Sequence, residues 1–272
     1  AGGLRVQFTK EIQRTTVQGS LLTLKVEGLL GGHSGQDIDK ERQNADLLMA
    51  RMIQRLLKET KGQLVSFNGG TKDNAIPREC EASLIYESDE EAAKAEELAC
   101  ELAETYAEEL TPAEPDFSCE ISCETNRTAE AIPQDAAKEF ICAMRLAPNG
   151  IQKRNIKMDG FVVVSLNLGV VRTEEDRIVM IFSPRSSVAS LQEDTKERLN
   201  TLAETFGFTV SHSSEYPGWS FKEDSPVREI CKESYKELFG EYLKIEAIHA
   251  GLECGLFSDA IKGLDAIADR KS

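Results

Sequence analysis

Hydrophobic residues along the chain recur with two periods, and these periods alternate from the N-terminus onward. Apolar and polar positions alternate over 4–15 and 21–27, which predicts two strands joined by a turn at 18–20. From about 37 to 58 the apolar positions instead recur at helical spacing, with charged residues between them. The chain is therefore expected to begin with two strands followed by an amphipathic helix.

The same alternation continues toward the C-terminus and favours an α/β fold. A hairpin is predicted where two strand patterns, 161–172 and 177–183, are separated by four polar residues. The other expected strands cover 64–67, 79–86, 117–123, 208–212 and 243–248, and further helices are expected to begin near 88, 133, 188 and 225.

A glycine-rich turn at 28–38 separates the first strands from the first helix. Four glycines and a serine within eight residues allow positive φ and close backbone approach, so the turn presents His33 rather than burying it. Asp37 or Asp39 is expected to cap the helix that follows. The alternative interpretation is a flexible connector whose histidine only hydrogen-bonds its own turn.

Composition restricts the classes of partner. The chain has 272 residues, with 32 basic against 47 acidic residues and a net charge of −15, which argues against nucleic acid or an anionic membrane surface as partner. The most apolar run, 161–171, is too short and too interrupted to span a bilayer. Seven cysteines without the spacing of a disulfide scaffold are typical of a reducing compartment, so a cytoplasmic location is predicted.

Five motifs, in this order along the chain, carry a family resemblance. They are Gly31-Gly32-His33-Ser34-Gly35, Asn74-Ala75-Ile76-Pro77-Arg78-Glu79, Arg185-Ser186-Ser187, Tyr216-Pro217-Gly218-Trp219 and Ile248-His249-Ala250-Gly251-Leu252-Glu253-Cys254-Gly255. Together they resemble the aminoacyl-histidine dipeptidases (Xaa-His dipeptidase, carnosinase, peptidase D) of the di-zinc aminopeptidase and carboxypeptidase superfamily.

The resemblance implies a two-layer sheet-and-helix lid domain inserted in an incomplete α/β catalytic domain. Residues 1–13 would be the end of the N-terminal catalytic segment, 14–212 the lid and dimerisation domain, and 213–272 the start of the C-terminal catalytic segment. A homodimer is expected, with the lid as the contact between the two copies.

Two zinc ions are implied for the full-length family, in which a His-x-Asp pair begins the ligand set. None of the three histidines here, His33, His212 and His249, is followed by aspartate at the second position. The chain is therefore expected to hold no metal or cofactor of its own. On this interpretation it is a fragment of a zinc-dependent dipeptidase that hydrolyses Xaa-His dipeptides, and it is inactive alone.

The resemblance also assigns the substrate-binding residues. His33 resembles the lid histidine that reaches the scissile carbonyl, a catalytic role, and Arg185 resembles the lid arginine that binds the terminal carboxylate of the dipeptide. Asn74, Gly251 and Glu253 lie in motifs that line the substrate. Both His33 and Arg185 are expected at exposed ends of secondary-structure elements.

Several structural alternatives stay open at this point. Arg185 could be a surface arginine, Asn74 could hold the lid turn, and Glu253 could cap a helix. His249 is expected to have a core or helix-terminal role, because a lone histidine after an apolar strand is usually satisfied structurally.

Two other functions compete with the dipeptidase fragment. One is a stand-alone lid-like module that dimerises or binds a partner through a free sheet edge, without catalysis. The other is a cysteine hydrolase that uses Cys254 with His249, for which no orienting Asn or Asp is evident.

Overall fold

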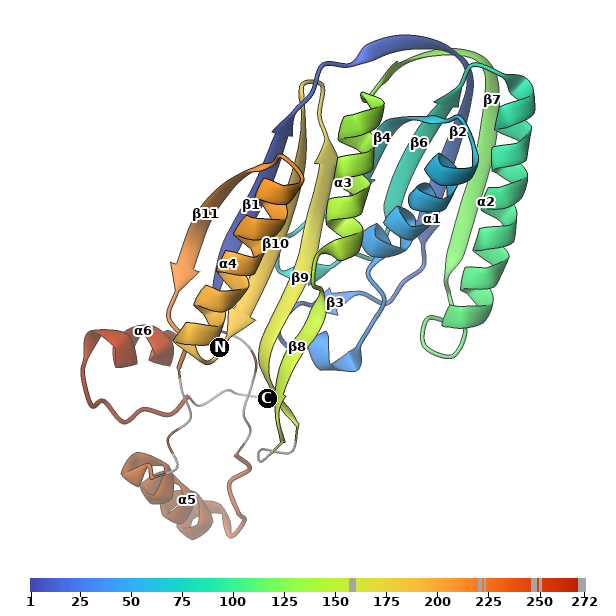
Figure 1. Cartoon of the computed structure of the whole chain (residues 1–272). Helices are drawn as coiled ribbons and strands as arrows, with labels where there is room; N and C mark the ends of the chain where they lie inside the picture. The colour runs from blue at the N-terminus through green and yellow to red at the C-terminus, as the bar shows by residue number, and fades with distance from the viewer. Residues whose placement is uncertain (157–159, 220–221, 223, 246–248, 250, 269–272) are drawn as a thin grey trace.

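A computed structural model describes residues 1–156, 160–219, 222, 224–245, 249 and 251–268 (Figure 1). Its main feature is a large antiparallel sheet whose strands run in the order β11-β1-β10-β9-β4-β6-β2-β7, with β8 added on β9. The strands are β1 (Gly2–Glu11), β2 (Thr15–Glu27), β4 (Gln63–Gly69), β6 (Cys80–Tyr86), β7 (Ser118–Ala131), β8 (Gly150–Asn155), β9 (Phe161–Thr173), β10 (Arg177–Ser186) and β11 (Thr209–Tyr216).

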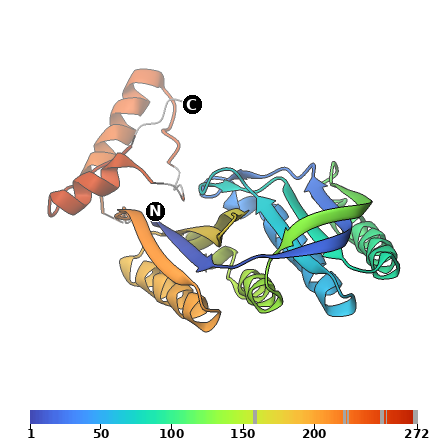
Figure 2. The same ribbon diagram turned by 90° about the horizontal axis from the view of Figure 1, so that it is seen from above.

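Four helices cover one face of this sheet, as Figure 2 shows from above. They are α1 (Ala45–Glu59), α2 (Asp89–Leu110), α3 (Gln134–Leu146) and α4 (Ala189–Thr205). The core lies between the two layers, where aromatic side chains such as Phe67 and Phe140 pack edge to face with ring centroids 5.4 Å apart. The predicted two-layer α/β fold is confirmed.

The turn predicted at 18–20 is wrong. β2 runs without interruption from Thr15 to Glu27, and the chain reverses direction at 12–14 instead. Gly19 is needed for a close approach within the sheet, because a Cβ there would lie 2.0 Å from the carbonyl oxygen of Tyr86. The pairing of β2 with β7 shifts register between Gly19 and Leu21, so the glycine marks a bulge and not a turn.

The helix cap predicted at Asp37 or Asp39 is also wrong. Asn44 caps α1, and its side-chain oxygen accepts hydrogen bonds from the backbone N–H groups of Asp46 and Leu47. Only a single 3-10 turn, η1 (Ile38–Lys40), follows the glycine-rich turn directly.

The segment after β11 contains α5 (Pro226–Phe239) and α6 (Glu253–Ala260). Ser225 caps α5 and Gly240 ends it with a φ of 74°, as the sequence predicts. The strand predicted near 243–248 is absent at 243–245, and 246–248 lie outside the described residues. In the part of the chain that the structure describes, no helix is long and apolar enough to cross a bilayer.

β1 is an internal strand of the sheet. It pairs with β10 on one side and with β11 on the other, so the sheet extends across the division predicted at residue 13. β11 likewise continues to Tyr216, beyond the division predicted at residue 212. The division into 1–13, 14–212 and 213–272 stays a prediction, but the sheet itself joins the first two segments and the start of the third.

Asp46 is a fully buried carboxyl group in the first turn of α1. Burial raises its pKa to about 8, although the neighbouring Cys80 and Arg172 act in the opposite direction. An aspartate in an unfolded chain titrates near pH 4, at about 3.9. Between these two values the folded chain therefore holds a proton that the unfolded chain has released, and the stability of the fold falls as the pH rises.

We predict that Asp46→Asn removes this pH dependence. Relative to the variant, the wild-type chain should lose stability on the order of 5 kcal/mol between pH 4 and pH 8, measured by urea unfolding at each pH. Glu90→Gln, which removes an exposed carboxylate on α2, is the matched control. Its stability should fall with pH as that of the wild type does. Parallel pH profiles for the wild type and Asp46→Asn would contradict the burial of a neutral carboxyl group.

Candidate functional site

Arg185 and the turn of His33 lie toward the end of the sheet where β10 and β11 finish and β1 begins, an end that Figure 1 shows near the N-terminus. Arg185 lies on β10, and its register partners are Gly3 on β1 and Ser165 on β9. Its side chain is only 6% exposed, so the expectation of an exposed arginine at a strand end is wrong. The reason is that strands flank β10 on both sides and the segment after β11 returns to this end of the sheet.

The side chain of Arg185 forms one hydrogen bond with the described residues. Its Nη1 donates a hydrogen bond to the Tyr216 hydroxyl at 2.8 Å, whereas its buried Nε has no partner there. No carboxylate in the described part of the chain forms an ion pair with it. A buried guanidinium without an anion is unfavourable, because burial removes the hydration of the charge without supplying a compensating partner.

His249 lies next to this arginine and is also buried, at 5% exposure. Its Nε2 is 2.8 Å from the Ser165 hydroxyl, and its ring meets Phe161 edge to face. Burial, aided by the positive charges of the Ala1 amino group and Arg185, lowers the pKa of His249 to about 3. His249 is therefore a neutral core residue near pH 7, as the sequence favours.

His33 lies in a two-stranded ribbon beside the main sheet. In it, β3 (Gly32–His33) pairs with β5 (Ala75–Ile76). The Nδ1 atom accepts hydrogen bonds from the backbone N–H groups of Gly35 and Gln36, at 3.0 and 3.1 Å. A neutral imidazole that accepts at Nδ1 carries its proton at Nε2, so this nitrogen is a hydrogen-bond donor. The side chain is half-buried, and the imidazole does bond its own turn.

Asp37 fixes the turn that holds His33. Its carboxylate accepts a hydrogen bond from the His33 backbone N–H at 2.8 Å and pairs with Lys40 Nζ at 2.6 Å. The Lys40 hydrogen bond and the His33 backbone hydrogen bond hold the pKa of Asp37 below its usual range. Gly32, with a φ of 138°, has no room for a side chain beside this carboxylate, since a Cβ would lie 2.8 Å from Oδ2.

The turn of His33 touches the segment of His249. A Cβ on Gly35 would lie 2.5 Å from the His249 carbonyl oxygen and 3.2 Å from the His33 ring. The structure therefore brings the His33 turn, His249 and Arg185 to one end of the sheet, from positions far apart in the sequence.

The other predicted residues lie at different distances from this centre. Gly251 is in it, because a Cβ there would be 2.7 Å from the Tyr216 ring. Asn74 is exposed, and its backbone carbonyl accepts a hydrogen bond from the Ser34 N–H. Arg78 supports the glycine-rich turn at 28–38, since its Nε donates to the Leu29 carbonyl at 3.1 Å. Glu253 is exposed in the first turn of α6.

The cysteine-hydrolase alternative finds no support in the geometry. The thiol of Cys254 points to the Ile267 carbonyl at 3.6 Å, whereas His249 Nε2 is occupied by Ser165. A nucleophilic cysteine needs its base within hydrogen-bond reach, and the described contacts do not pair these two side chains.

The described residues do not form a metal site. They contain no group of three His, Cys, Asp or Glu side chains that could hold an ion. His212 Nε2 lies 3.0 Å from Asn200 Oδ1, away from the other two histidines. The zinc site implied by the resemblance is therefore not formed by the described residues, and no catalytic step through a metal is derived from them.

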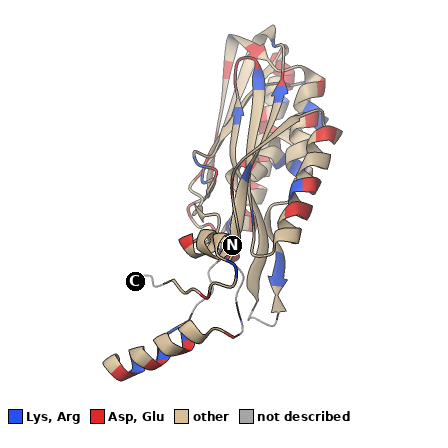
Figure 3. Ribbon diagram, turned by 90° about the vertical axis from the view of Figure 1, so that its left-hand side faces the viewer, with Lys and Arg blue, Asp and Glu red and all other residues tan. Residues whose placement is uncertain are grey.

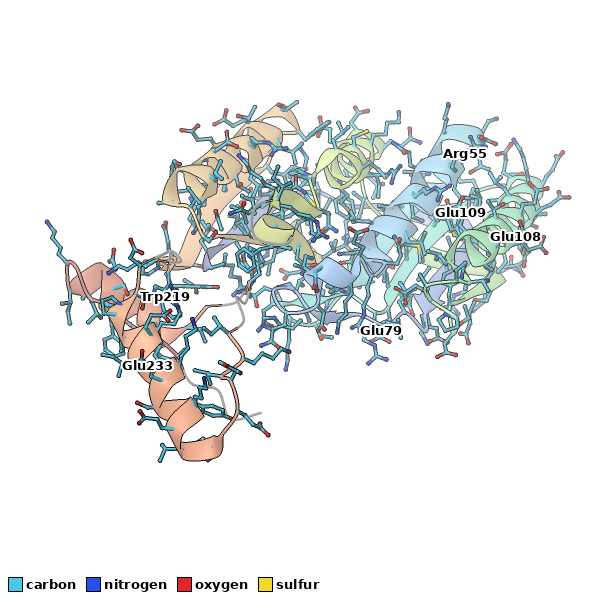
Figure 4. The ribbon with its side chains drawn as sticks, turned by 90° about the horizontal axis from the view of Figure 1, so that it is seen from below. Arg55, Glu79, Glu108, Glu109, Trp219 and Glu233 are labelled. Carbon is cyan, nitrogen blue, oxygen red and sulfur yellow. The ribbon has the colours of Figure 1, made fainter. Side chains whose placement is uncertain are left out.

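Tyr216 is a site residue that the sequence analysis did not single out. It belongs to the Tyr-Pro-Gly-Trp motif, but its contact with Arg185 depends on strand pairing and could not be read from the motif. Figure 4 shows the neighbouring Trp219 on the C-terminal segment, far from Glu108 and Glu109 of α2.

A sheet covered on one face by four helices, with a histidine turn and a buried arginine at one end, is the lid fold of a dipeptidase. The model of the peptidase dimerisation domain of the M20 peptidases matches residues 24–114. The chain belongs to the M20 peptidase family.

Two relatives extend the likeness beyond that domain. The cytosol non-specific dipeptidase of Escherichia coli is 31% identical over 274 residues, which cover 98% of this chain and 55% of that protein. The crystal structure of aminoacylhistidine dipeptidase from Vibrio alginolyticus matches with a TM-score of 0.86 and 34% identity, over 95% of this chain and 53% of that one. The chain thus spans about half the length of these relatives.

We predict that Arg185→Met stabilises the chain. Methionine has a similar length and removes an unpaired buried charge, so the free energy of unfolding should rise by about 1–3 kcal/mol in urea titrations. Arg172→Met is the matched control and should destabilise, because Arg172 donates to the backbone carbonyls of Gly69, Gly70 and Val171. A comparable loss of stability in both variants would identify Arg185 as a structural anchor.

Proposed function

We propose that this chain is the substrate-binding lid, with a short piece of the catalytic domain, of a zinc-dependent dipeptidase that hydrolyses Xaa-His dipeptides. On this proposal the zinc ligands belong to parts of the enzyme outside residues 1–272. The chain contributes the residues that bind the substrate, and it is inactive alone.

The observation that carries the proposal is the buried, unpaired guanidinium of Arg185. Its Nε lacks a partner from the described residues, and its Nη1 is held by a neutral hydroxyl, so the positive charge is left for an external anion. A carboxylate matches the planar guanidinium through two parallel hydrogen bonds. The C-terminal carboxylate of a dipeptide is an anion of this kind.

His33 supplies the second part of the proposal. Its Nε2–H is a donor suited to the scissile carbonyl, whose oxygen gains negative charge when water attacks. The donor is pre-organised, because the two backbone amides at Nδ1 fix both the tautomer and the orientation of the ring. In the proposed enzyme His33 is therefore a catalytic residue that acts on the oxyanion.

The remaining predicted residues take smaller roles in this proposal. Gly251 leaves room beside Tyr216 and forms a wall of the carboxylate pocket. Asn74 and Glu253, both exposed, would contact the substrate only when further parts of the enzyme close over this end of the sheet. Glu253 would then accept a hydrogen bond from the imidazole of a substrate histidine.

The C-terminal segment favours a part of a larger enzyme over a stand-alone module. α5 has no buried residue although it is amphipathic, and it carries charges of both signs (Figure 3). Large apolar side chains on and after it are exposed, among them Leu238 at 77%, Phe239 at 65% and Tyr242 at 80%. An apolar surface of this kind normally packs against another part of a protein.

We also propose that the enzyme is a homodimer and that it works in the cytosol. The dimer is supported by the match to the peptidase dimerisation domain and by β7, which ends the sheet with an unpaired edge in the described structure. The cytosolic location is supported by the name of the Escherichia coli relative.

A kinetic experiment tests the proposed function. The 272-residue chain should show no turnover of an Xaa-His dipeptide, whereas a longer chain that adds the catalytic half should hydrolyse it. In the longer chain, His33→Ala should lower kcat by about 10²–10³ and leave KM within about twofold, because the lost donor acts mainly in the transition state.

His212→Ala is the matched control, since this exposed histidine on β11 lies within hydrogen-bond distance of Asn200 on α4. Its kcat should equal that of the unmodified longer chain. Hydrolysis by the 272-residue chain alone, or a His33→Ala variant with unchanged kcat, would refute the proposed function.

A further inference from the structure

The hydrogen bond from Arg185 to Tyr216 determines which edge of the guanidinium is left for a ligand. A guanidinium can bind a carboxylate through its two Nη atoms or through Nε and Nη2. Nη1 already donates to the Tyr216 hydroxyl at 2.8 Å, and Nε has no partner from the described residues. Because Nε is buried and Nη1 already donates to Tyr216, Nη2 is the nitrogen left for a carboxylate.

Tyr216 reaches Arg185 because two glycines make room for its ring. Gly3 is the register partner of both residues, so β1 separates them in the sheet. A Cβ on Gly3 would lie 2.5 Å from the Tyr216 hydroxyl oxygen, and a Cβ on Gly251 would lie 2.7 Å from its ring. The ring thus crosses β1 above Gly3 and is covered from the other side by Gly251.

We propose that Tyr216 is a positioning residue for Arg185. It holds Nη1 so that Nη2 points at the carboxylate of the substrate. This inference rests on the proposed function, in which Arg185 binds that carboxylate, and it adds a residue that neither the sequence motifs nor the family comparison assigns.

The chemistry of a phenol suits this role. Its oxygen accepts the Nη1–H hydrogen bond without bringing a negative charge, so the guanidinium keeps its full charge for the ligand. An aspartate or glutamate at the same place would orient Arg185 equally well but would neutralise it and compete with the substrate. Because rotation of the planar guanidinium moves Nη2 away from the carboxylate, loss of the hydroxyl should weaken carboxylate binding specifically.

A binding experiment on the 272-residue chain tests the inference. N-acetyl-L-histidine, which carries the carboxylate, and its amide, which lacks it, are titrated separately by calorimetry to obtain each Kd, and the Arg185 Nε–H resonance is followed by NMR in parallel titrations. The acid should shift this resonance and the amide should not. In Tyr216→Phe, which keeps the ring packing, the Kd for the acid should rise about tenfold, whereas the response to the amide should stay unchanged.

Three further variants complete the design. Gly3→Ala should reproduce the effect of Tyr216→Phe, because the added Cβ displaces the hydroxyl. Tyr242→Phe is the matched control, since it removes an exposed hydroxyl that accepts from Lys236 Nζ at 3.0 Å, and its Kd should equal that of the wild type. Arg185→Ala identifies the Nε–H resonance and should abolish the preference for the acid.

The outcomes separate the two proposals. If the wild type does not prefer the acid over the amide, or if Arg185→Ala keeps that preference, then Arg185 does not bind a carboxylate. In that case the proposed function loses its main support, and this inference fails with it. If Arg185→Ala loses the preference but Tyr216→Phe binds the acid as the wild type does, only the positioning role of Tyr216 is overturned.

Discussion

The pairing of β1 between β10 and β11 is the constraint on which the arrangement of this chain depends. It joins residues 2–11 to strands that lie more than 160 positions later in the sequence, and it aligns Gly3 with Arg185 on one side and with Tyr216 on the other. Without this strand, β11 would have no partner in the sheet, and the buried arginine would lose its hydrogen-bond partner. The fold and the candidate site are therefore consequences of the same set of backbone hydrogen bonds.

The buried charge at this place is unfavourable for the fold and useful for binding. The helix-covered layer supplies a continuous apolar core from β1 to β7, which stabilises the fold enough to tolerate an unpaired guanidinium at one end of the sheet. A preformed, partly desolvated cation attracts a carboxylate more strongly than an exposed arginine does, because less water screens the interaction. His33 is likewise preformed, because backbone amides set the orientation of its ring before any substrate binds.

Local signals in the sequence predicted those parts of the fold that depend on local chemistry. The hairpin of β9 and β10 and the capped helix α5 follow from strand alternation, a polar turn, a serine cap and a terminal glycine. The prediction for Gly19 was wrong because Gln-Gly-Ser is a good turn sequence, whereas the glycine is needed for contact with Tyr86 across the sheet. Asp37 and Asn44 are both good caps, and only the packing of α1 decides between them.

The sequence also predicted part of the candidate site. The motifs directed attention to His33, Arg185 and Gly251, which the structure does bring to one end of the sheet. The burial of Arg185 and its bond to Tyr216 arise from the pairing of distant strands, so no spacing within the sequence could show them. The substrate roles of these residues stay predictions, and the proposed enzyme depends most directly on the carboxylate-binding role of Arg185.

A crystal structure of the chain with bound N-acetyl-L-histidine tests that role most directly. We expect a carboxylate oxygen within about 3 Å of Arg185 Nη2, while Nη1 still donates to the Tyr216 hydroxyl. A ligand bound elsewhere, or an Arg185 side chain turned toward a carboxylate of its own chain, would contradict the account.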